Sequence, residues 1–265
     1  MSPISKNDLL NVAVEACLAS SDIIMESLGL AKISKKKGKT NLVTETDLKS
    51  EKIIKELIQS NFKNHQVMAE ESDDIYKSDS KYLWIIDPLD GTTNFVHGYP
   101  SFSVSIALYK DNGPYIAAVL EMPNLKLYTA QKNKGAFCEG RQILSSATTK
   151  LEDTLLVTGF GYEHGNNWNK NMKLFKHFTD ITQGVRRLGA ASIDICHVAS
   201  GLVDGFWEYD LKPWDTAAGI LIAQEAGCLI SDINGNPYDL NSQSILITNK
   251  HIKNEFLQEV KDQLN

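Results

Sequence analysis

Apolar positions recur with helical spacing in the N-terminal part of the chain. Ser5 and Asp8 have the spacing of a capping box, and apolar side chains then repeat every three or four positions until Gly29. A second pattern of this kind begins near Thr46 and carries Ile53, Ile54, Leu57 and Ile58. The pattern predicts two amphipathic helices joined by a loop rich in Lys and Gly.

Short apolar runs follow, and the first two end abruptly at acidic residues. Residues 67–69 precede Glu70 and Glu71, and residues 82–86 precede Asp87. Each run predicts a buried strand with a carboxylate at its end. Four further segments, separated by Asn- and Gly-containing turn sequences, predict an antiparallel meander over residues 102–109, 115–121, 125–131 and 135–138.

The pattern changes near residues 145–150, where strands begin to alternate with helices. We expect strands at residues 155–157, 229–230 and 245–247, and helices at 168–182, 190–200, 214–226 and the polar C-terminus. The change predicts an α+β half over residues 1–148 and an α/β half over residues 149–265.

Composition and charge narrow the functional class. Apolar residues make up 42% of the chain and charged residues 23%, as in a soluble globular protein. No apolar run approaches the ~20 residues of a membrane helix, and the N-terminus lacks the features of a secretory signal, so we expect a cytoplasmic protein with no membrane partner. The four cysteines form no Cys-x-x-Cys pair, which argues against a zinc ribbon or a disulfide framework. The net charge of −6 argues against broad nucleic-acid binding.

The most informative segment follows the second apolar run and reads WIIDPLDGTTN. Pro88 fixes the backbone angle directly after Asp87, where we expect the chain to leave the sheet. Asp90 comes three residues later, and a helical turn here would aim both carboxylates to one side. Gly91 and Thr92 then offer backbone N–H groups at a helix start, where a phosphate can sit. The alternative is an Asp-Gly hairpin turn, but no return strand follows immediately.

Asp215 repeats this theme in the second half of the chain, just before an apolar helix. A simple helix-capping role is the alternative for Asp215, as a surface position is for Glu70. Taken together, the oxygen donors at the ends of buried elements are Glu70, Asp87, Asp90 and Asp215, with the carbonyl of Leu89 as a further one. This set suits Mg²⁺ rather than Zn²⁺. Crowded carboxylates also repel each other unless cations hold them.

Phosphate monoester hydrolysis fits this donor set. It is among the slowest uncatalysed reactions and requires accelerations of up to ~10²¹. A single general base supplies only ~10²–10⁴. Divalent metals generate hydroxide and neutralise phosphoryl oxygens, so the sequence favours a Mg²⁺-dependent phosphomonoesterase.

Four stretches resemble motifs of the inositol monophosphatases, within the wider fructose-bisphosphatase-like superfamily. In family order they are NLVTETD from Asn41, AEES from Ala69, DPLDGTTN from Asp87 and WDTAAG from Trp214. The segments TGFGY from Thr158 and RRLGAA from Arg186 resemble the bacterial and plastid branch. The resemblance implies an α+β protein built as a layered αβαβα sandwich with mixed and antiparallel sheets.

The resemblance also implies roles for individual residues. Two or three Mg²⁺ would be bound by Glu70, Asp87, the Leu89 carbonyl, Asp90 and Asp215. The catalytic residues that activate the attacking water would be Asp47, Thr92 and Glu70. The substrate would contact Gly91, Thr92, Gly189, Ala190, Ala191, Glu208 and Asp215. Lys36 falls where the family has a lysine near the metal site, although a solvated loop cation is an equal alternative.

The first substrate to expect is myo-inositol 1-phosphate, hydrolysed by metal-activated water in a lithium-sensitive homodimer. Asn41, where the family often has Asp, and Asp210, an additional carboxylate near the substrate rim, are departures that bear on substrate identity. Alternatives in the same superfamily are phosphatases of histidinol phosphate, fructose bisphosphate, related sugars or a phosphoadenosine nucleotide. A non-catalytic partner of transcription or RNA complexes, and a sugar-binding domain with a structural Mg²⁺, are alternatives from other classes.

Overall fold

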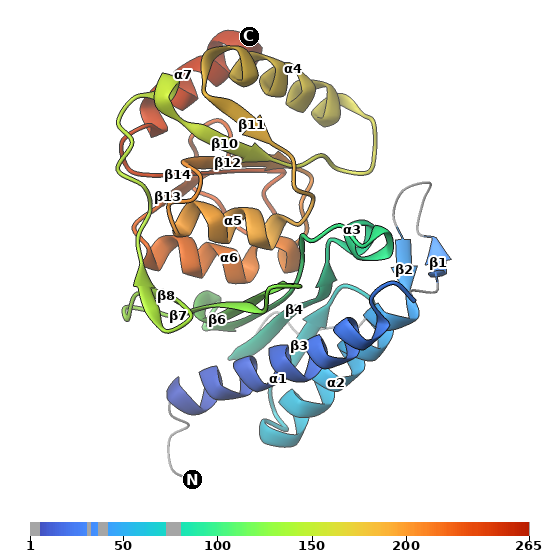
Figure 1. Ribbon diagram of the computed structural model, residues 1–265. Coiled ribbons are helices and arrows are strands. Elements are labelled where there is room, and N and C mark those ends of the chain that lie inside the picture. Colours follow the sequence, from blue (N-terminus) through green and yellow to red (C-terminus); the bar gives the residue numbers. More distant parts are fainter. Residues whose placement is uncertain (1–5, 31–32, 37–41, 73–80, 265) are drawn as a thin grey trace.

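The computed structural model describes residues 6–30, 33–36, 42–72 and 81–264, which form five alternating layers of helices and sheets (Figure 1). Helices α1 (Lys6–Ser27) and α2 (Glu45–Asn61) form the first layer, and a seven-stranded sheet the second. Helices α5 (Ala191–Ala199) and α6 (Pro213–Glu225) separate this sheet from a five-stranded one. The predicted αβαβα sandwich is therefore confirmed. No described helix is long and apolar enough to cross a membrane.

The seven-stranded sheet contains the predicted meander. Its order is β3-β4-β5-β6-β7-β8-β9, and only the β3–β4 pair is parallel. The strands are β3 (Gln66–Ala69), β4 (Tyr82–Asp90), β5 (Phe102–Lys110), β6 (Gly113–Met122), β7 (Lys126–Gln131), β8 (Ala136–Cys138) and β9 (Arg141–Ile143). The short edge strand β9 was not among the predicted ones. Helix α3 (Thr92–His97) follows β4 with only Gly91 between them.

The five-stranded sheet has the order β11-β10-β12-β14-β13 and is mixed. The strands are β10 (Leu155–Thr158), β11 (Gly184–Arg186), β12 (Gly205–Tyr209), β13 (Leu229–Ser231) and β14 (Ser244–Thr248). Strand β10 is parallel to β11 and β12, whereas β14 is antiparallel to β12 and β13. The central strand β12 is buried along its whole length, yet the apolar pattern did not predict it.

Helices α4 (Asn166–Ile181) and α7 (Lys253–Leu264) cover the outer face of this sheet. Helices α4, α5 and α6 begin and end close to the predicted bounds, and α7 is the predicted polar C-terminal helix. A single 3₁₀ turn, η1 (Leu151–Asp153), precedes β10. The described part of the second half thus alternates strands and helices as expected.

Two local predictions are wrong. The Lys- and Gly-rich stretch contains a pair of short antiparallel strands, β1 (Ile33–Lys36) and β2 (Leu42–Thr44), instead of a loop throughout. Asp87 and Asp90 do not lie on a helical turn, because β4 continues through both of them. The pairing of β4 with β5 becomes irregular between these two residues, and such an irregularity accommodates Pro88, which has no N–H for the ladder.

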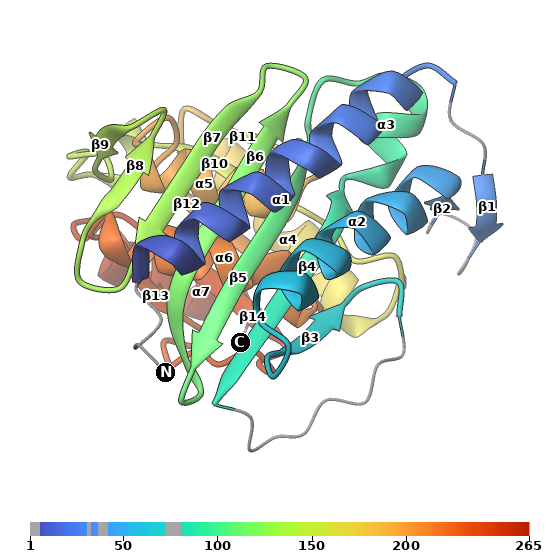
Figure 2. The same cartoon turned by 90° about the horizontal axis from the view of Figure 1, so that it is seen from below.

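Three hydrophobic clusters fill the spaces between the layers. One lies between the seven-stranded sheet and the helices α1 and α2, which cross it side by side (Figure 2). The second joins both sheets through α5 and α6, and the third lies under α4 and α7. The two sheets fall on either side of the predicted boundary at residue 148, but they share the second cluster. The division of the chain into two halves at residue 148 thus remains a prediction.

The close packing of α5 against α6 provides a stability test. A Cβ atom built on Gly219 would lie 2.8 Å from Cγ2 and 2.9 Å from Cβ of Ile195. We expect Gly219→Ala to destabilise the protein by about 1–3 kcal/mol through overpacking, against a gain of about 1 kcal/mol from helix propensity. Urea unfolding measures the difference. If the clash is the cause, the double variant Gly219→Ala/Ile195→Ala should be more stable than the sum of the single changes indicates.

Candidate active site

The four predicted acids come from three segments that the fold brings to one edge of the seven-stranded sheet. Asp87 and Asp90 lie at the end of β4. Glu70 directly follows β3, whose last residue pairs with the residue before Asp87 in a parallel arrangement. Parallel strands end at the same edge, so Glu70 reaches the same end of the sheet as Asp87. Asp215 stands in the first turn of α6, and its Oδ2 accepts the N–H of Lys212 at 2.6 Å.

The acids lie within electrostatic range of one another. Asp87 is 2% exposed and Asp90 is 8% exposed. Burial, followed by the negative charges of Glu70, Asp90 and Asp215, raises the pKa of Asp87 well above its usual range. Burial and the charge of Asp90 raise the pKa of Asp215 to about 7. The fold therefore concentrates negative charge that costs free energy unless protons or cations neutralise it.

The chemistry of this donor set fits a hard divalent cation. Among the described residues, no group of three His, Cys, Asp or Glu side chains stands out by its spacing as a metal site. Carboxylate oxygens with a nearby backbone carbonyl are nevertheless the ligands that Mg²⁺ prefers.

Asp47 and Thr92 meet directly beside the acids. Asp47 is fully buried in the first turn of α2, where its Oδ2 accepts the N–H of Thr44 at 2.9 Å and thereby completes a capping box. Its Oδ1 accepts the hydroxyl of Thr92 at 2.9 Å. The hydroxyl of Thr92 also lies 3.0 Å from the carbonyl oxygen of Leu89. A hydrogen bond between residues 45 apart in sequence thus joins the first turns of α2 and α3.

Gly91 provides the backbone turn between β4 and α3. Its φ of 85° lies in the left-handed region that glycine adopts without strain. A Cβ atom here would lie 3.0 Å from the carbonyl oxygen of Ser101 and 3.2 Å from Cβ of Ala190. The turn therefore packs tightly against the start of α5. That its amides bind phosphate stays a prediction.

The predicted substrate wall is tied to this turn. Asn94 Nδ2 on α3 donates to the carbonyl oxygens of Ser101 at 2.6 Å and Leu188 at 2.7 Å. Gly189 follows with a left-handed φ of 90°, and Ala190 and Ala191 are buried at the beginning of α5. The structure thus places Ala190 against Gly91 and Gly189 beside Asn94, which brings the start of α5 to the Gly91 turn.

Glu208 is a buried carboxylate on the central strand β12. It is 6% exposed, and a Cβ atom on Gly159 would collide with its carboxylate oxygens. Burial and the charge of Asp215 raise the pKa of Glu208 well above its usual range, while Arg187 opposes this shift. Glycine at position 159 therefore makes room for the carboxylate.

The remaining predicted residues are peripheral or undescribed. Asp210 is exposed, has a φ of 63° and accepts a hydrogen bond of 2.7 Å from Asn167 Nδ2. Lys36 ends β1, but its side chain and Asn41 lie outside the described residues.

Sequence reasoning missed two supporting residues. Ser192 donates two hydrogen bonds to Asp90, and Glu51 accepts the N–H of Glu71 at 2.9 Å, next to Glu70. Both are polar and buried, and the burial of a polar side chain is not visible in the sequence alone.

The raised pKa values of the buried carboxylates predict an unusual pH dependence of protein stability in the absence of divalent cations. The pKa of Asp215 is about 7 in the folded state and about 3.9 in unfolded chains. Between these values the folded state binds more protons, so its stability falls as the pH rises. In EDTA we expect Tm to fall by a few degrees between pH 5.5 and 8, since 1 kcal/mol shifts Tm by about 2–4 °C at this size. Thermal scans should show a smaller fall with Mg²⁺ and in Asp215→Asn; a rising Tm in EDTA contradicts the assignment.

A layered α+β sandwich with buried acids at one sheet edge, next to a buried Asp–Thr pair, defines the class of protein to which this chain belongs. Comparison with known sequences identifies the family. A model of the inositol monophosphatase family matches residues 5–265, and the chain belongs to this family.

Similarity to individual relatives extends over nearly the whole chain. This chain is 44% identical to the chloroplastic phosphatase IMPL1 of Arabidopsis thaliana, over 97% of this chain and 71% of that protein. An inositol-1-monophosphatase of Synechocystis is 41% identical, over 97% and 90%. The Nus factor SuhB of Pseudomonas aeruginosa is 38% identical, over 91% of each chain. Among solved structures, the extragenic suppressor protein suhB of Bartonella henselae superposes with a TM-score of 0.91 at 34% identity, over 97% and 99%.

Proposed function

We propose that this protein is a Mg²⁺-dependent phosphatase of small hydroxylated phosphomonoesters, with myo-inositol 1-phosphate as its first candidate substrate. The observation that carries the proposal is the arrangement around Asp87. The charges of three other acids raise the pKa of Asp87, namely Glu70 after β3, Asp90 in β4 and Asp215 in α6. A buried hydrogen-bonded pair, Asp47 and Thr92, lies beside them. The similarity to proteins named inositol-1-monophosphatase supports this reading.

In the proposed mechanism, Glu70, Asp87, Asp90, Asp215 and the Leu89 carbonyl hold two or three Mg²⁺. The bound cations supply charge neutralisation and lower the pKa of water. Thr92 orients the attacking water through its hydroxyl, and Asp47 accepts the proton that Thr92 passes on, with Glu70 as the third catalytic residue. Burial raises the pKa of Asp47, which favours such a proton transfer, while hydrogen bonds from Thr44 and Thr92 lower it.

The proposed substrate lies between the Gly91 turn and the start of α5. The amides of Gly91 and Thr92 bind the phosphate, while Gly189, Ala190 and Ala191 line the polyol pocket. Glu208 accepts hydrogen bonds from substrate hydroxyls. Its carboxylate is buried, which raises its pKa, and the hydroxyls of a polyol would compensate for its lost hydration.

Phosphate release from a panel of esters tests the proposal. The panel contains myo-inositol 1-phosphate, histidinol phosphate, fructose 1,6-bisphosphate and a 3′-phosphoadenosine nucleotide, each with Mg²⁺, with EDTA and with added Li⁺. We expect Mg²⁺-dependent release, fastest from inositol phosphate and inhibited by Li⁺. Release that persists in EDTA contradicts the metal assignment, whereas a preference for another ester changes only the substrate. Light scattering tests the proposed homodimer.

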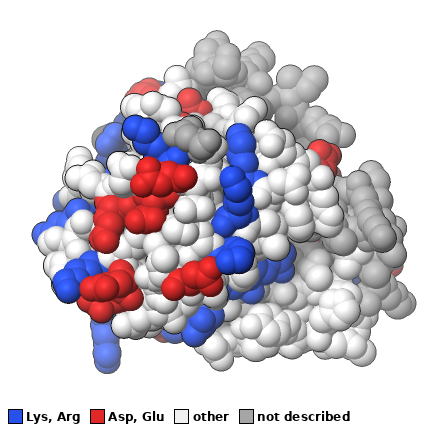
Figure 3. Space-filling model, turned by 90° about the horizontal axis from the view of Figure 1, so that it is seen from above, with Lys and Arg blue, Asp and Glu red and all other residues white. Residues whose placement is uncertain are grey.

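A second candidate function is a non-catalytic role in transcription complexes. The similarity to proteins named Nus factor SuhB favours it. On the face over α4 and α7, Lys and Arg side chains lie beside several acids (Figure 3), as in the Lys176–Asp180 ion pair at 2.7 Å. The neighbouring acids weaken the attraction of this face for RNA. Co-purification of transcription proteins with both wild-type protein and Asp90→Asn would support this role.

A further inference from the structure

The hydroxyl of a serine at the start of α5 contacts the edge of the seven-stranded sheet that carries the acids. Ser192, the second residue of α5, donates its backbone N–H to Asp90 Oδ2 at 2.8 Å. Its hydroxyl donates to the same oxygen at 2.6 Å. The serine is fully buried, so water does not compete for either bond. Hydrogen bonds to a carboxylate are stronger than those between neutral groups, and two of them restrict its rotation.

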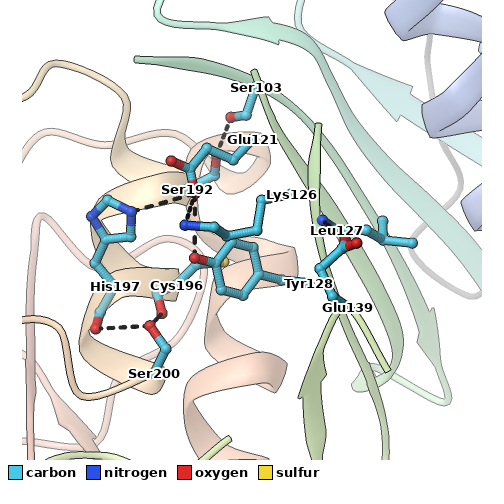
Figure 4. Close-up of polar contacts among 10 residues, drawn as sticks. All are labelled: Ser103, Glu121, Lys126, Leu127, Tyr128, Glu139, Ser192, Cys196, His197 and Ser200. Carbon is cyan, nitrogen blue, oxygen red and sulfur yellow. Dashed lines mark hydrogen bonds and ion pairs between the residues drawn. The ribbon is translucent and has the colours of Figure 1, made fainter. Parts of the chain in front are cut away.

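A second hydroxyl supports the first. Ser103 on β5 is also fully buried, and its Oγ lies 2.7 Å from Oγ of Ser192 (Figure 4). Because the hydroxyl hydrogen of Ser192 points to Asp90, the hydrogen of this second bond comes from Ser103. Ser103 is also the residue that pairs with Asp90 across the β4–β5 ladder. The three side chains therefore form one directed chain, Ser103 to Ser192 to Asp90, between sheet and helix.

We propose that Ser192 is a positioning residue for the metal ligand Asp90. Its two bonds both go to Oδ2, restrict the rotation of the carboxylate and leave Oδ1 without a bond from Ser192. Because Ser192 follows the residues predicted to line the substrate pocket, the same helix start sets both the pocket and the metal ligand. This inference rests on the proposed function, since it assumes a cation at Asp90.

The experiment measures Mg²⁺ affinity directly by isothermal titration calorimetry, in addition to turnover. Loss of a residue that orients a metal ligand lowers metal affinity by about 10–100-fold, and we expect at least a tenfold weakening in Ser192→Ala. The Mg²⁺ concentration for half-maximal activity should rise in parallel, with kcat at saturating Mg²⁺ close to wild type. Ser192→Thr keeps the hydroxyl and should restore affinity, and Ser103→Ala should weaken it to a smaller extent.

A matched control lies at the other end of the same helix. Ser200 donates its hydroxyl to the carbonyl oxygen of Cys196 at 2.9 Å and, within the described part of the chain, makes no hydrogen bond with Ser192 or Ser103 (Figure 4). Ser200→Ala removes one helix-associated hydroxyl and should leave Mg²⁺ affinity unchanged.

Each outcome decides between the proposals. Wild-type protein that binds no Mg²⁺ overturns both this inference and the proposed function. Wild-type binding with an unchanged affinity in Ser192→Ala overturns only the positioning role. If Ser192→Ala does not fold, Ser103→Ala decides, and an unchanged affinity there overturns the hydroxyl chain.

Discussion

Replacing Asp90 by Asn should reduce kcat by at least roughly 10²–10³-fold, the usual cost of removing one preorganised electrostatic stabiliser. Asp90 lies at the end of β4 in the middle of the acid group, and its charge contributes to the raised pKa of both Asp87 and Asp215. The amide has the same shape but no negative charge, so it binds a divalent cation weakly. Phosphate release at increasing Mg²⁺ concentrations measures the loss, which excess metal should not fully restore.

The fold should survive this change. The amide oxygen of Asn can still accept the bonds that Ser192 donates, and the variant relieves repulsion among buried carboxylates. In EDTA we therefore expect a Tm equal to or above that of wild type. Asp111→Asn, which removes the same charge from the exposed β5–β6 turn, is the control and should keep full activity. A folded Asp90→Asn protein with normal activity rules out Asp90 as a metal ligand.

The acid edge could be predicted from the sequence because its signal is local. An apolar run that stops abruptly at a carboxylate marks a buried strand whose end is polar, as at Asp87, and the structure places Glu70 and Asp90 at the same edge. The conformation between Asp87 and Asp90 could not be predicted in this way. Its extended form depends on pairing with β5, which continues beyond Pro88 through an irregular register.

Strand β12 and Ser192 show the limits of pattern reading in a different way. The segment GFWEY carries Glu208 at a buried position, which interrupts the expected apolar run. A buried carboxylate is costly, so local rules fail where a site requires one. Ser192 looks like an ordinary residue of a helix start, and its role depends on Asp90, 102 residues away in sequence. Such contacts become visible only when the layers are assembled.

The second large effect is expected at the hydroxyl of Thr92. Thr92→Val retains the shape of the side chain but removes the hydroxyl that donates to Asp47 and also lies 3.0 Å from the Leu89 carbonyl oxygen. If Thr92 and Asp47 together activate the attacking water, kcat should fall by about 10²–10⁴-fold, the contribution of a positioned general base. Calorimetry should find Mg²⁺ affinity close to wild type, because no carboxylate is changed. This separates the effect from that of Asp90→Asn.

Thr92 is a cleaner position for this test than Asp47, because Asp47 also caps α2 through its bond with the N–H of Thr44. A change at Asp47 would combine lost catalysis with a lost helix cap, which costs about 0.5–2 kcal/mol. The neighbouring Thr93 is exposed on α3, so Thr93→Val is the matched control and should remain active. If Thr92→Val and Thr93→Val have equal kcat values at saturating Mg²⁺, the attacking water is not activated through the Asp47–Thr92 pair, and the proton must leave by another route.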